Sequence, residues 1–477
     1  MTKRWPLLAL AALGLGKLLL LAVVGPSLQE DSGLYVAYAD AILGGSGFAP
    51  VPWGADAVPP TIFRLAGYPL ALAAAKLVAP AHFAVVIVVA QIVLALAAIA
   101  LVFRVLAPIF RSRAAAFAAC ALYGLSSAVL WDNAILVDSL YASLFTIVLF
   151  ALLGHAAGVF RLPLWAFAAL GLAWAYSTWL RDSGLYFTFL PLILLAVAAV
   201  AERRGGMRRA APAALFLAVV AAMTGGYMEL NRYRTGELFF GITGVENWLR
   251  PAFDMAADGY AWPFADDGLV STTVRATMTH FDFPAQEQFV AALHARCGCT
   301  PLQIEALERA KLIAVVREHP VAYLRVVLRN FNYLGLGSNL ADPVAILNQV
   351  VEYGTSYGAR LVPGPSLRNL RAFAAGGRLA GLAGMGLAAL STAVSAALFT
   401  LFLFGLPVTG WLAWRRGAVP PGLYAALFLW VTFVAVSFAF SLIHYESRHA
   451  LPVLPAAAAG IAYMLLRVGW LRDRPAG

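Results

Sequence analysis

Residues 82–106 read HFAVVIVVAQIVLALAAIALVFRVL. A run of about 20 apolar residues is long enough to cross the hydrocarbon core of a bilayer as a helix. Similar runs recur along the chain, in which 62% of residues are hydrophobic and only 12% are charged. The mean hydropathy of +0.79 is far above that of a water-soluble protein of this length. The sequence therefore predicts an all-α polytopic membrane protein.

The apolar runs on either side of this stretch predict a bundle of about ten transmembrane helices. The expected spans are residues 6–25, 82–106, 114–131, 139–158, 163–180, 184–200, 211–230, 385–414, 421–443 and 450–468. Lysine and arginine gather at one set of loops, whereas the short segments on the other side carry only Arg64, Lys76, Arg181 and Arg448. The positive-inside rule places the basic loops and both termini in the cytoplasm. The net charge of +10 thus reports topology, and no nucleic-acid partner is expected.

Hydropathy also divides the chain into three parts. Residues 1–230 form an N-terminal transmembrane module with a first external loop at 26–81, residues 231–384 an extracytoplasmic insert, and residues 385–477 a C-terminal transmembrane module. Apolar segments 33–43 and 67–80 are too short to span the bilayer. The first predicts an interfacial helix and the second an interfacial or re-entrant helix. The insert is expected to be mostly helical. Cys297 and Cys299 within it are close enough to form a disulfide, but the sequence does not decide whether they do.

Three charged motifs stand at the ends of apolar spans: Glu30-Asp31-Ser32, residues 132–138 with Asp132 and Asp138, and residues 444–449, HYESRH. Charge near a bilayer core is costly and is seldom placed there without a role. In the predicted topology all three motifs face the outer side, so that they can contribute to one site.

Each motif also has a structural alternative. Asp31 and Asp138 could cap the helices that follow them. Glu446 and Arg448 could neutralise each other, and Lys17, inside the first span, could be a functional group or pair within the bundle. The spacing of His444 and Glu446 could suggest a metal site, but no third ligand is identifiable.

The motifs follow one long pattern. It runs through Asp31-Ser32-x-x-Tyr35, Gly45-x-Gly47 and Arg64-x-x-Gly67-Tyr68-Pro69, then Asp138, and ends with Glu446-x-Arg448-His449-x-x-Pro452-x-x-Pro455. This pattern resembles the GT-C glycosyltransferases that use polyprenyl-phosphate sugars. The resemblance is to bacterial members related to dolichyl-phosphate-mannose protein mannosyltransferases and aminoarabinose transferases. The match departs at Leu65-Ala66, where the family often has Pro-Pro, and at His449, where Tyr is common.

The resemblance implies roles for particular residues. Asp31 corresponds to the acidic general base of the family and Asp138 to the acidic residue of its second external loop, so both are expected to be catalytic. The expected substrate-binding residues are Glu30, Tyr35, Arg64, Tyr68, Arg181, Glu446, Arg448 and His449. Independently, sugar transfer needs a carboxylate to take a proton and cations to hold a phosphate leaving group. No metal ligands are identified, and a divalent cation as cofactor is left open.

The resulting hypothesis is an inverting glycosyltransferase of the bacterial inner membrane with its site on the periplasmic or external face. Its partners would be a polyprenyl-phosphate-linked sugar donor, a lipid, glycan or protein acceptor, and membrane lipids. Two rivals remain at this point: a polymerase or ligase of surface polysaccharide, and a lipid-linked-sugar transporter. A transporter usually shows repeated halves with broken helices, and the sequence has no internal repeat.

Overall fold

The computed structural model describes residues 5–29, 31–51, 60–126, 128–201, 207–242, 247–260, 262–281, 283–336, 379–417, 419–443 and 447–468. These residues are predominantly helical and contain no β-strand, only an isolated bridge between Ser27 and Ala134. In the described ranges seven helices are long and apolar enough to cross a membrane. The fold is therefore all-α and consistent with a multi-pass membrane protein, as the composition predicted.

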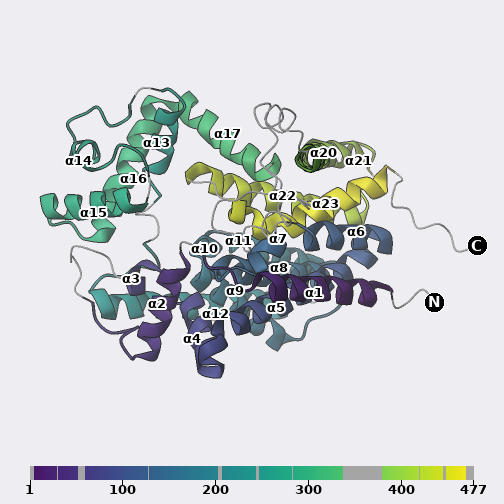
Figure 1. The fold of residues 1–477 in the computed structure, drawn as a ribbon. Coiled ribbons are helices and arrows are strands. Elements are labelled where there is room, and N and C mark those ends of the chain that lie inside the picture. The colour runs from purple at the N-terminus through teal and green to yellow at the C-terminus, as the bar shows by residue number, and fades with distance from the viewer. Residues whose placement is uncertain are drawn as a thin grey trace, which may run out of the picture.

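The N-terminal module holds most of the apolar helices (Figure 1). Its elements are α1 (Trp5–Val24), α2 (Ser32–Leu43), α3 (Pro60–Phe63), α4 (Gly67–Val78), η1 (Pro80–His82), α5 (Phe83–Phe110), α6 (Arg113–Gly124), α7 (Ala128–Asp132), α8 (Val137–Ala156), α9 (Leu164–Leu180), α10 (Ser183–Tyr186), α11 (Phe189–Ala201) and α12 (Met207–Thr235). The short helices expected at 33–43 and 67–80 are present as α2 and α4. Lys76 of α4 pairs with Asp40 of α2 and ties the two together.

The C-terminal module contains α20 (Leu379–Thr400), a π-helical turn η3 (Leu401–Gly405), α21 (Leu406–Arg415), α22 (Pro421–Ile443), a 3-10 segment η4 (Ser447–Val453) and α23 (Leu454–Arg467). The expected spans largely coincide with helix where they are described, but several differ from an unbroken helix of full length. Residues 114–131 are divided between α6 and α7, and residues 184–200 between α10 and α11. In addition, α9 has only 17 residues, and the apolar stretch of α1 is Leu8–Val24. The count of ten spans thus stays a prediction.

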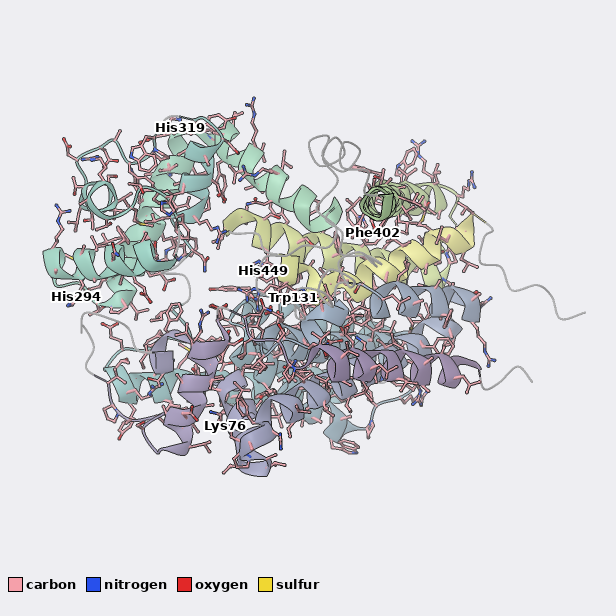
Figure 2. The ribbon with its side chains drawn as sticks, viewed as in Figure 1. Lys76, Trp131, His294, His319, Phe402 and His449 are labelled. Atoms are coloured by element: carbon pink, nitrogen blue, oxygen red, sulfur yellow. A yellow bond between two sulfur atoms is a disulfide. The ribbon has the colours of Figure 1, made fainter. Side chains whose placement is uncertain are left out.

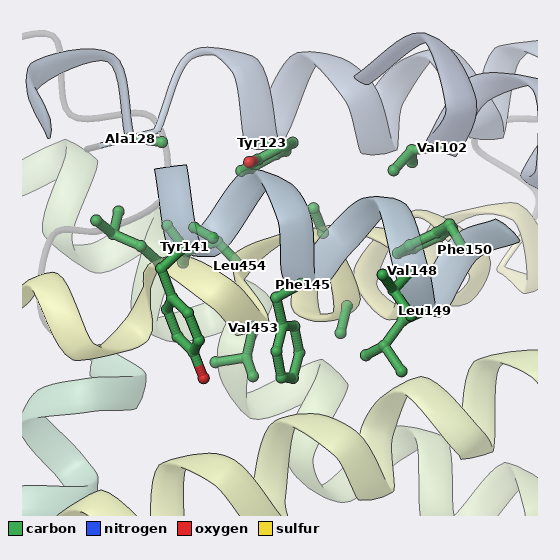
Figure 3. Packing of buried hydrophobic residues seen from close by; sticks show 14 of the residues in the cluster. Val102, Tyr123, Ala128, Tyr141, Phe145, Val148, Leu149, Phe150, Val453 and Leu454 are labelled. Atoms are coloured by element: carbon green, nitrogen blue, oxygen red, sulfur yellow. The ribbon is translucent and has the colours of Figure 1, made fainter. Parts of the chain in front are cut away.

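The core of the bundle lies around α8 and α23, whose side chains are almost all buried. Figure 3 shows Phe145, Val148 and Leu149 of α8 beside Val453 and Leu454. Small residues let α23 approach its neighbours closely, as is usual between membrane helices. Gly460 is the extreme case, because a Cβ there would overlap the ring of Phe402.

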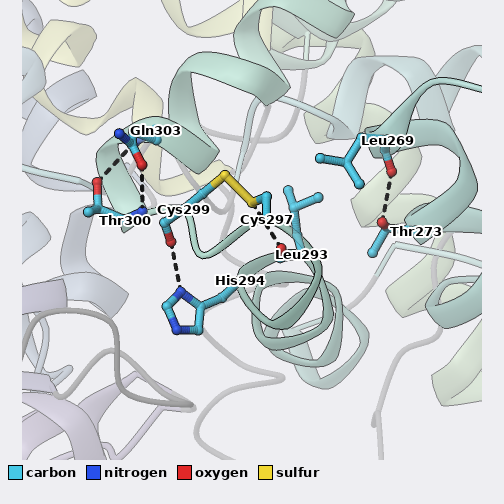
Figure 4. Close-up of a disulfide and its surroundings, with 8 residues drawn as sticks. All are labelled: Leu269, Thr273, Leu293, His294, Cys297, Cys299, Thr300 and Gln303. Atoms are coloured by element: carbon cyan, nitrogen blue, oxygen red, sulfur yellow. Dashed lines mark hydrogen bonds between the residues drawn. A yellow bond between two sulfur atoms is a disulfide. The ribbon is translucent and has the colours of Figure 1, made fainter.

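The described part of the insert folds around its own apolar core. It comprises α13 (Arg250–Ala257), α14 (Leu269–Thr277), α15 (Phe283–Cys297), α16 (Pro301–Glu318) and α17 (Pro320–Leu336), which confirms the expectation of helices. Cys297 and Cys299 form a disulfide at the end of α15 (Figure 4). The Thr300 side chain and Gln303 then make a capping box that starts α16.

The insert is attached to the bundle on two sides. Ile62 of α3 belongs to the core of the insert, and Tyr323 of α17 donates a hydrogen bond of 2.7 Å to the carbonyl of Leu442 at the end of α22. Asn330, also in α17, donates to the carbonyl of Ser441. These contacts place the insert over the same end of the bundle as α2, α3 and η4.

The contact between Gly460 and Phe402 gives a stability prediction. Gly460→Ala should lower the free energy of unfolding by about 1–3 kcal/mol, because the new methyl group overpacks a rigid aromatic contact. Phe402→Leu in the same chain should restore part of it. The measurement is thermal unfolding in detergent, with Gly225→Ala in α12 as the control, since a Cβ at Gly225 meets nothing within 4 Å. Equal melting temperatures for the Gly460 and Gly225 variants would contradict the prediction.

Candidate functional site

The first external loop and the loop before α8 are fastened together. The Ser27 amide donates to the Asn133 carbonyl and the Ile135 amide donates to the Ser27 carbonyl, each at 2.8 Å. The Ser32 hydroxyl donates a further bond of 2.8 Å to the carbonyl of Ile135. This clamp brings the start of α2 beside the start of α8, and with them Asp31 and Asp138.

Asp31 stands at the N-cap position of α2, but its side chain makes no capping hydrogen bond. Both of its carboxylate oxygens accept from arginines instead. Arg64 Nη2 lies 2.8 Å from Oδ1, and Arg448 Nη2 lies 3.0 Å from Oδ2. The prediction that the Asp31 side chain caps α2 is therefore wrong, and Asp31 instead belongs to a cluster of ion pairs.

Arg448 joins the two predicted catalytic carboxylates. Its Nη1 atom lies 3.9 Å from Asp138 Oδ2, while its other terminal nitrogen binds Asp31. Asp138, in the first turn of α8, also pairs with Arg181 Nη2 at 2.7 Å. Arg181, at the end of α9, thus makes a long-range ion pair with the start of α8.

We call these five side chains the Asp31 cluster: Asp31, Arg64, Asp138, Arg181 and Arg448. Within this set, three guanidinium groups against two carboxylates leave one excess positive charge. The exposed fractions are 18% for Asp31 and Arg448 and 2% for Asp138. The cluster is thus largely sheltered, but Asp31 and Arg448 remain partly accessible to solvent.

Aromatic rings line the cluster. The Arg64 guanidinium lies over the rings of Phe63 at 4.7 Å and Tyr35 at 5.4 Å. Burial raises the pKa of Tyr35, an effect that the nearby Arg64 partly offsets, so its phenol stays protonated at neutral pH. Tyr68 packs edge-on against Tyr35 and donates a hydrogen bond of 2.9 Å to Gln91. Tyr35 therefore borders the ion pairs directly, whereas Tyr68 supports it from behind.

His449 lies on the opposite side. Its ring stacks on Phe440 with centroids 4.7 Å apart, and the same Phe440 lies under the Arg181 guanidinium at 6.0 Å. His449 belongs to η4, which packs against α8, and Figure 2 shows it where the C-terminal helices meet the N-terminal module. Phe440 is a residue that sequence reasoning missed, since an apolar residue within a predicted span gives no signal.

Lys17 is not part of the Asp31 cluster. It forms a buried ion pair with Asp132, which also accepts a hydrogen bond of 2.5 Å from Ser139. Gln91 donates to the Asp132 and Ala134 carbonyls, so this polar network holds the loop before α8. Of the two roles considered for Lys17, the pairing inside the bundle is the one observed.

Two predicted binding residues, Glu30 and Glu446, lie outside the described residues, as does His444. Within the described ranges no three His, Cys, Asp or Glu side chains come together as a metal site requires. No known protein family, curated protein or solved structure matches this chain. Its function must therefore be argued from the geometry of the Asp31 cluster.

The buried ion pair of Lys17 and Asp132 gives a prediction that tests its structural role. Lys17→Met should destabilise the protein by about 3–5 kcal/mol, because it leaves Asp132 charged and buried. The double variant Lys17→Met/Asp132→Asn should recover much of this loss, since the introduced amide is neutral and its oxygen can still accept from Ser139. Melting temperatures in detergent measure both effects. A double variant no more stable than the single one would show that the pair is not the cause.

Proposed function

We propose that this protein is a membrane glycosyltransferase that moves a sugar from a polyprenyl-phosphate carrier to a lipid, glycan or protein acceptor. The observation that carries the proposal is the Asp31 cluster itself. Residues from the first loop, the start of α8, the end of α9 and η4 converge there. A general base and several phosphate-binding cations in one sheltered place are what this reaction needs.

The proposed step is a single displacement. The acceptor hydroxyl attacks the anomeric carbon of the sugar while the bond from that carbon to the carrier phosphate breaks. The phosphate oxygen keeps the electron pair, and Asp31 takes the proton of the hydroxyl. Attack opposite the leaving group inverts the anomeric configuration, and guanidinium groups stabilise the charge that develops on the phosphate.

The ion pairs of Asp31 set a condition for this step. Both carboxylate oxygens of Asp31 accept hydrogen bonds from guanidinium groups, so one arginine must turn away before an oxygen can accept the proton of the acceptor hydroxyl. In the proposal the phosphate of the sugar donor causes this movement, because it competes with Asp31 for the same guanidinium hydrogen-bond donors. In the proposed mechanism the donor draws Arg448 or Arg64 onto its phosphate and thereby frees an Asp31 oxygen for the acceptor.

Asp138 has a different proposed role. It is buried in the first turn of α8, where Arg181 and Arg448 both reach it. A group so enclosed is suited to positioning arginines rather than to accepting a proton from a substrate. The sequence pattern placed both aspartates in a catalytic pair, and the geometry favours Asp31 as the base.

Asp31→Asn should lower transfer by at least about 100-fold, because Asn keeps the shape but cannot accept the proton. The assay is turnover of purified protein with a polyprenyl-phosphate sugar, together with a melting curve. Asp40→Asn is the matched control, as Asp40 is also an ion-paired aspartate of the same loop but lies outside the cluster. Normal turnover in the Asp31 variant would remove it as the base.

Arg448→Ala should strongly weaken use of the lipid donor, and Arg448→Lys should restore only part of it because the planar fork is lost. Arg329→Ala, which breaks ion pairs within the insert, serves as the control. Transfer is measured with a polyprenyl-phosphate sugar, with a diphosphate-linked glycan and with a nucleotide sugar. Preference for the diphosphate-linked glycan would favour the polymerase or ligase, and efficient use of the nucleotide sugar would overturn the proposal.

The proposal also requires the cluster to face outward. Single cysteines at Ser46 in the first loop and Thr279 in the insert should react with an impermeant thiol reagent in spheroplasts, and one at Arg416 should not. All three positions are exposed, and the native cysteines are either buried or in a disulfide. Labelling of Arg416→Cys but not Ser46→Cys would place the site in the cytoplasm and contradict the proposal.

A further inference from the structure

A second candidate site lies at the other end of the bundle. Asp138 stands at the start of α8, and Ala156 ends this 20-residue helix. At about 1.5 Å per residue the two ends are roughly 30 Å apart, which matches the thickness of the hydrocarbon core. Ala156 borders a cavity of about 1160 Å³ that is therefore separate from the Asp31 cluster.

The walls of this cavity are the ends of several helices. They come from the last turns of α5, α8 and α23, the middle of α11 and the first turns of α22. The lining is apolar apart from Arg111, Arg467, Tyr424 and Tyr463, and it contains no acidic residue. Pro421 starts α22 at this wall, directly after Pro420. Gly422 lets the helix approach the end of α5, since a Cβ there would lie 3.0 Å from the carbonyl oxygen of Ile109.

The two arginines at the cavity are placed by helix ends. Arg111 terminates α5 in a left-handed conformation with φ 52°, directly before Ser112, whose side chain caps α6. Arg467 ends α23. Both are exposed, and within the described ranges neither forms an ion pair with a carboxylate. Two guanidinium groups that no described carboxylate neutralises therefore border an apolar cavity at a membrane interface.

The cavity is also accessible from the side of the bundle. Val197 of α11 and Tyr424 of α22 line it, with exposed fractions of 51% and 63%. An occupant can thus extend from the arginines along apolar surface that would face lipid in a membrane. Basic pockets between membrane helices bind anionic lipid head groups.

We infer that this cavity is a binding site for an anionic phospholipid of the membrane. Its phosphate would lie between Arg111 and Arg467, and an acyl chain would fill the apolar space bounded by α8, α11 and α22. Charge complementarity selects the occupant, because the lining offers two cations and no acidic group to a head group. A zwitterionic lipid carries its own ammonium group beside the phosphate and would gain less from this site. The inference does not depend on the proposed transferase activity.

The test is native mass spectrometry of the full-length protein released from nanodiscs of equimolar phosphatidylglycerol and phosphatidylcholine. The wild type should retain phosphatidylglycerol at least about tenfold over phosphatidylcholine, because two arginines contact its head group. Arg111→Gln/Arg467→Gln should lose this preference. Arg415→Gln/Arg416→Gln is the matched control, because those arginines are exposed at the end of α21 but do not line the cavity, and it should behave as the wild type.

A second variant tests the cavity rather than the charge. Val197→Trp fills the lateral opening from an exposed position, leaves both arginines in place, and should also abolish retention. Melting curves establish that each variant is folded. Equal retention of both lipids by the wild type, unchanged retention in the Arg111/Arg467 variant, or loss in the control alone would overturn the inference. Displacement of phosphatidylglycerol by an equal amount of a polyprenyl phosphate would also overturn it and assign the cavity to that carrier.

Discussion

The arrangement of the candidate site depends on one guanidinium group that touches two carboxylates. Arg448, from the segment between the last two helices, reaches Asp31 of the first loop and Asp138 of α8. Charges that are taken out of water need partners, and here the partners come from opposite ends of the sequence. The N- and C-terminal modules are thereby joined at a polar point, while the apolar contacts of α8 and α23 hold the rest of the bundle together.

Two kinds of ion pair stand side by side in this region and differ in access. Lys17 and Asp132 are enclosed, with exposed fractions of 3% and 5%, and serve to hold the loop before α8. Asp31 and Arg448 keep 18% of their side chains accessible. An enclosed ion pair persists because dissolved ions cannot reach it and compete for its charges. An open pair with excess positive charge can be exchanged for a contact with a bound anion, which is why the proposed function rests on the Asp31 cluster.

The two ends of the bundle present different chemistry. At one end, the insert packs on α3 and α22 beside a cluster that contains both acids and bases. At the other, arginines without a described acidic partner border an apolar cavity. The long helices α8 and α22 connect the two ends, so that packing at the cavity and the position of η4 depend on the same rigid elements.

The sequence by itself determined the all-α class, the position of the long apolar helices and the charged residues that meet in the Asp31 cluster, because apolar runs and scarce charges are strong local signals. It could not determine which charges pair. Arg181 pairs with Asp138 of α8, and Arg448 reaches Asp31 from the opposite end of the chain. Nor could the sequence predict the break between α6 and α7, the contacts of Phe440 or the cavity at the far end of α8. These features depend on distances between segments far apart in the chain, and only the packing of the helices in three dimensions decided them.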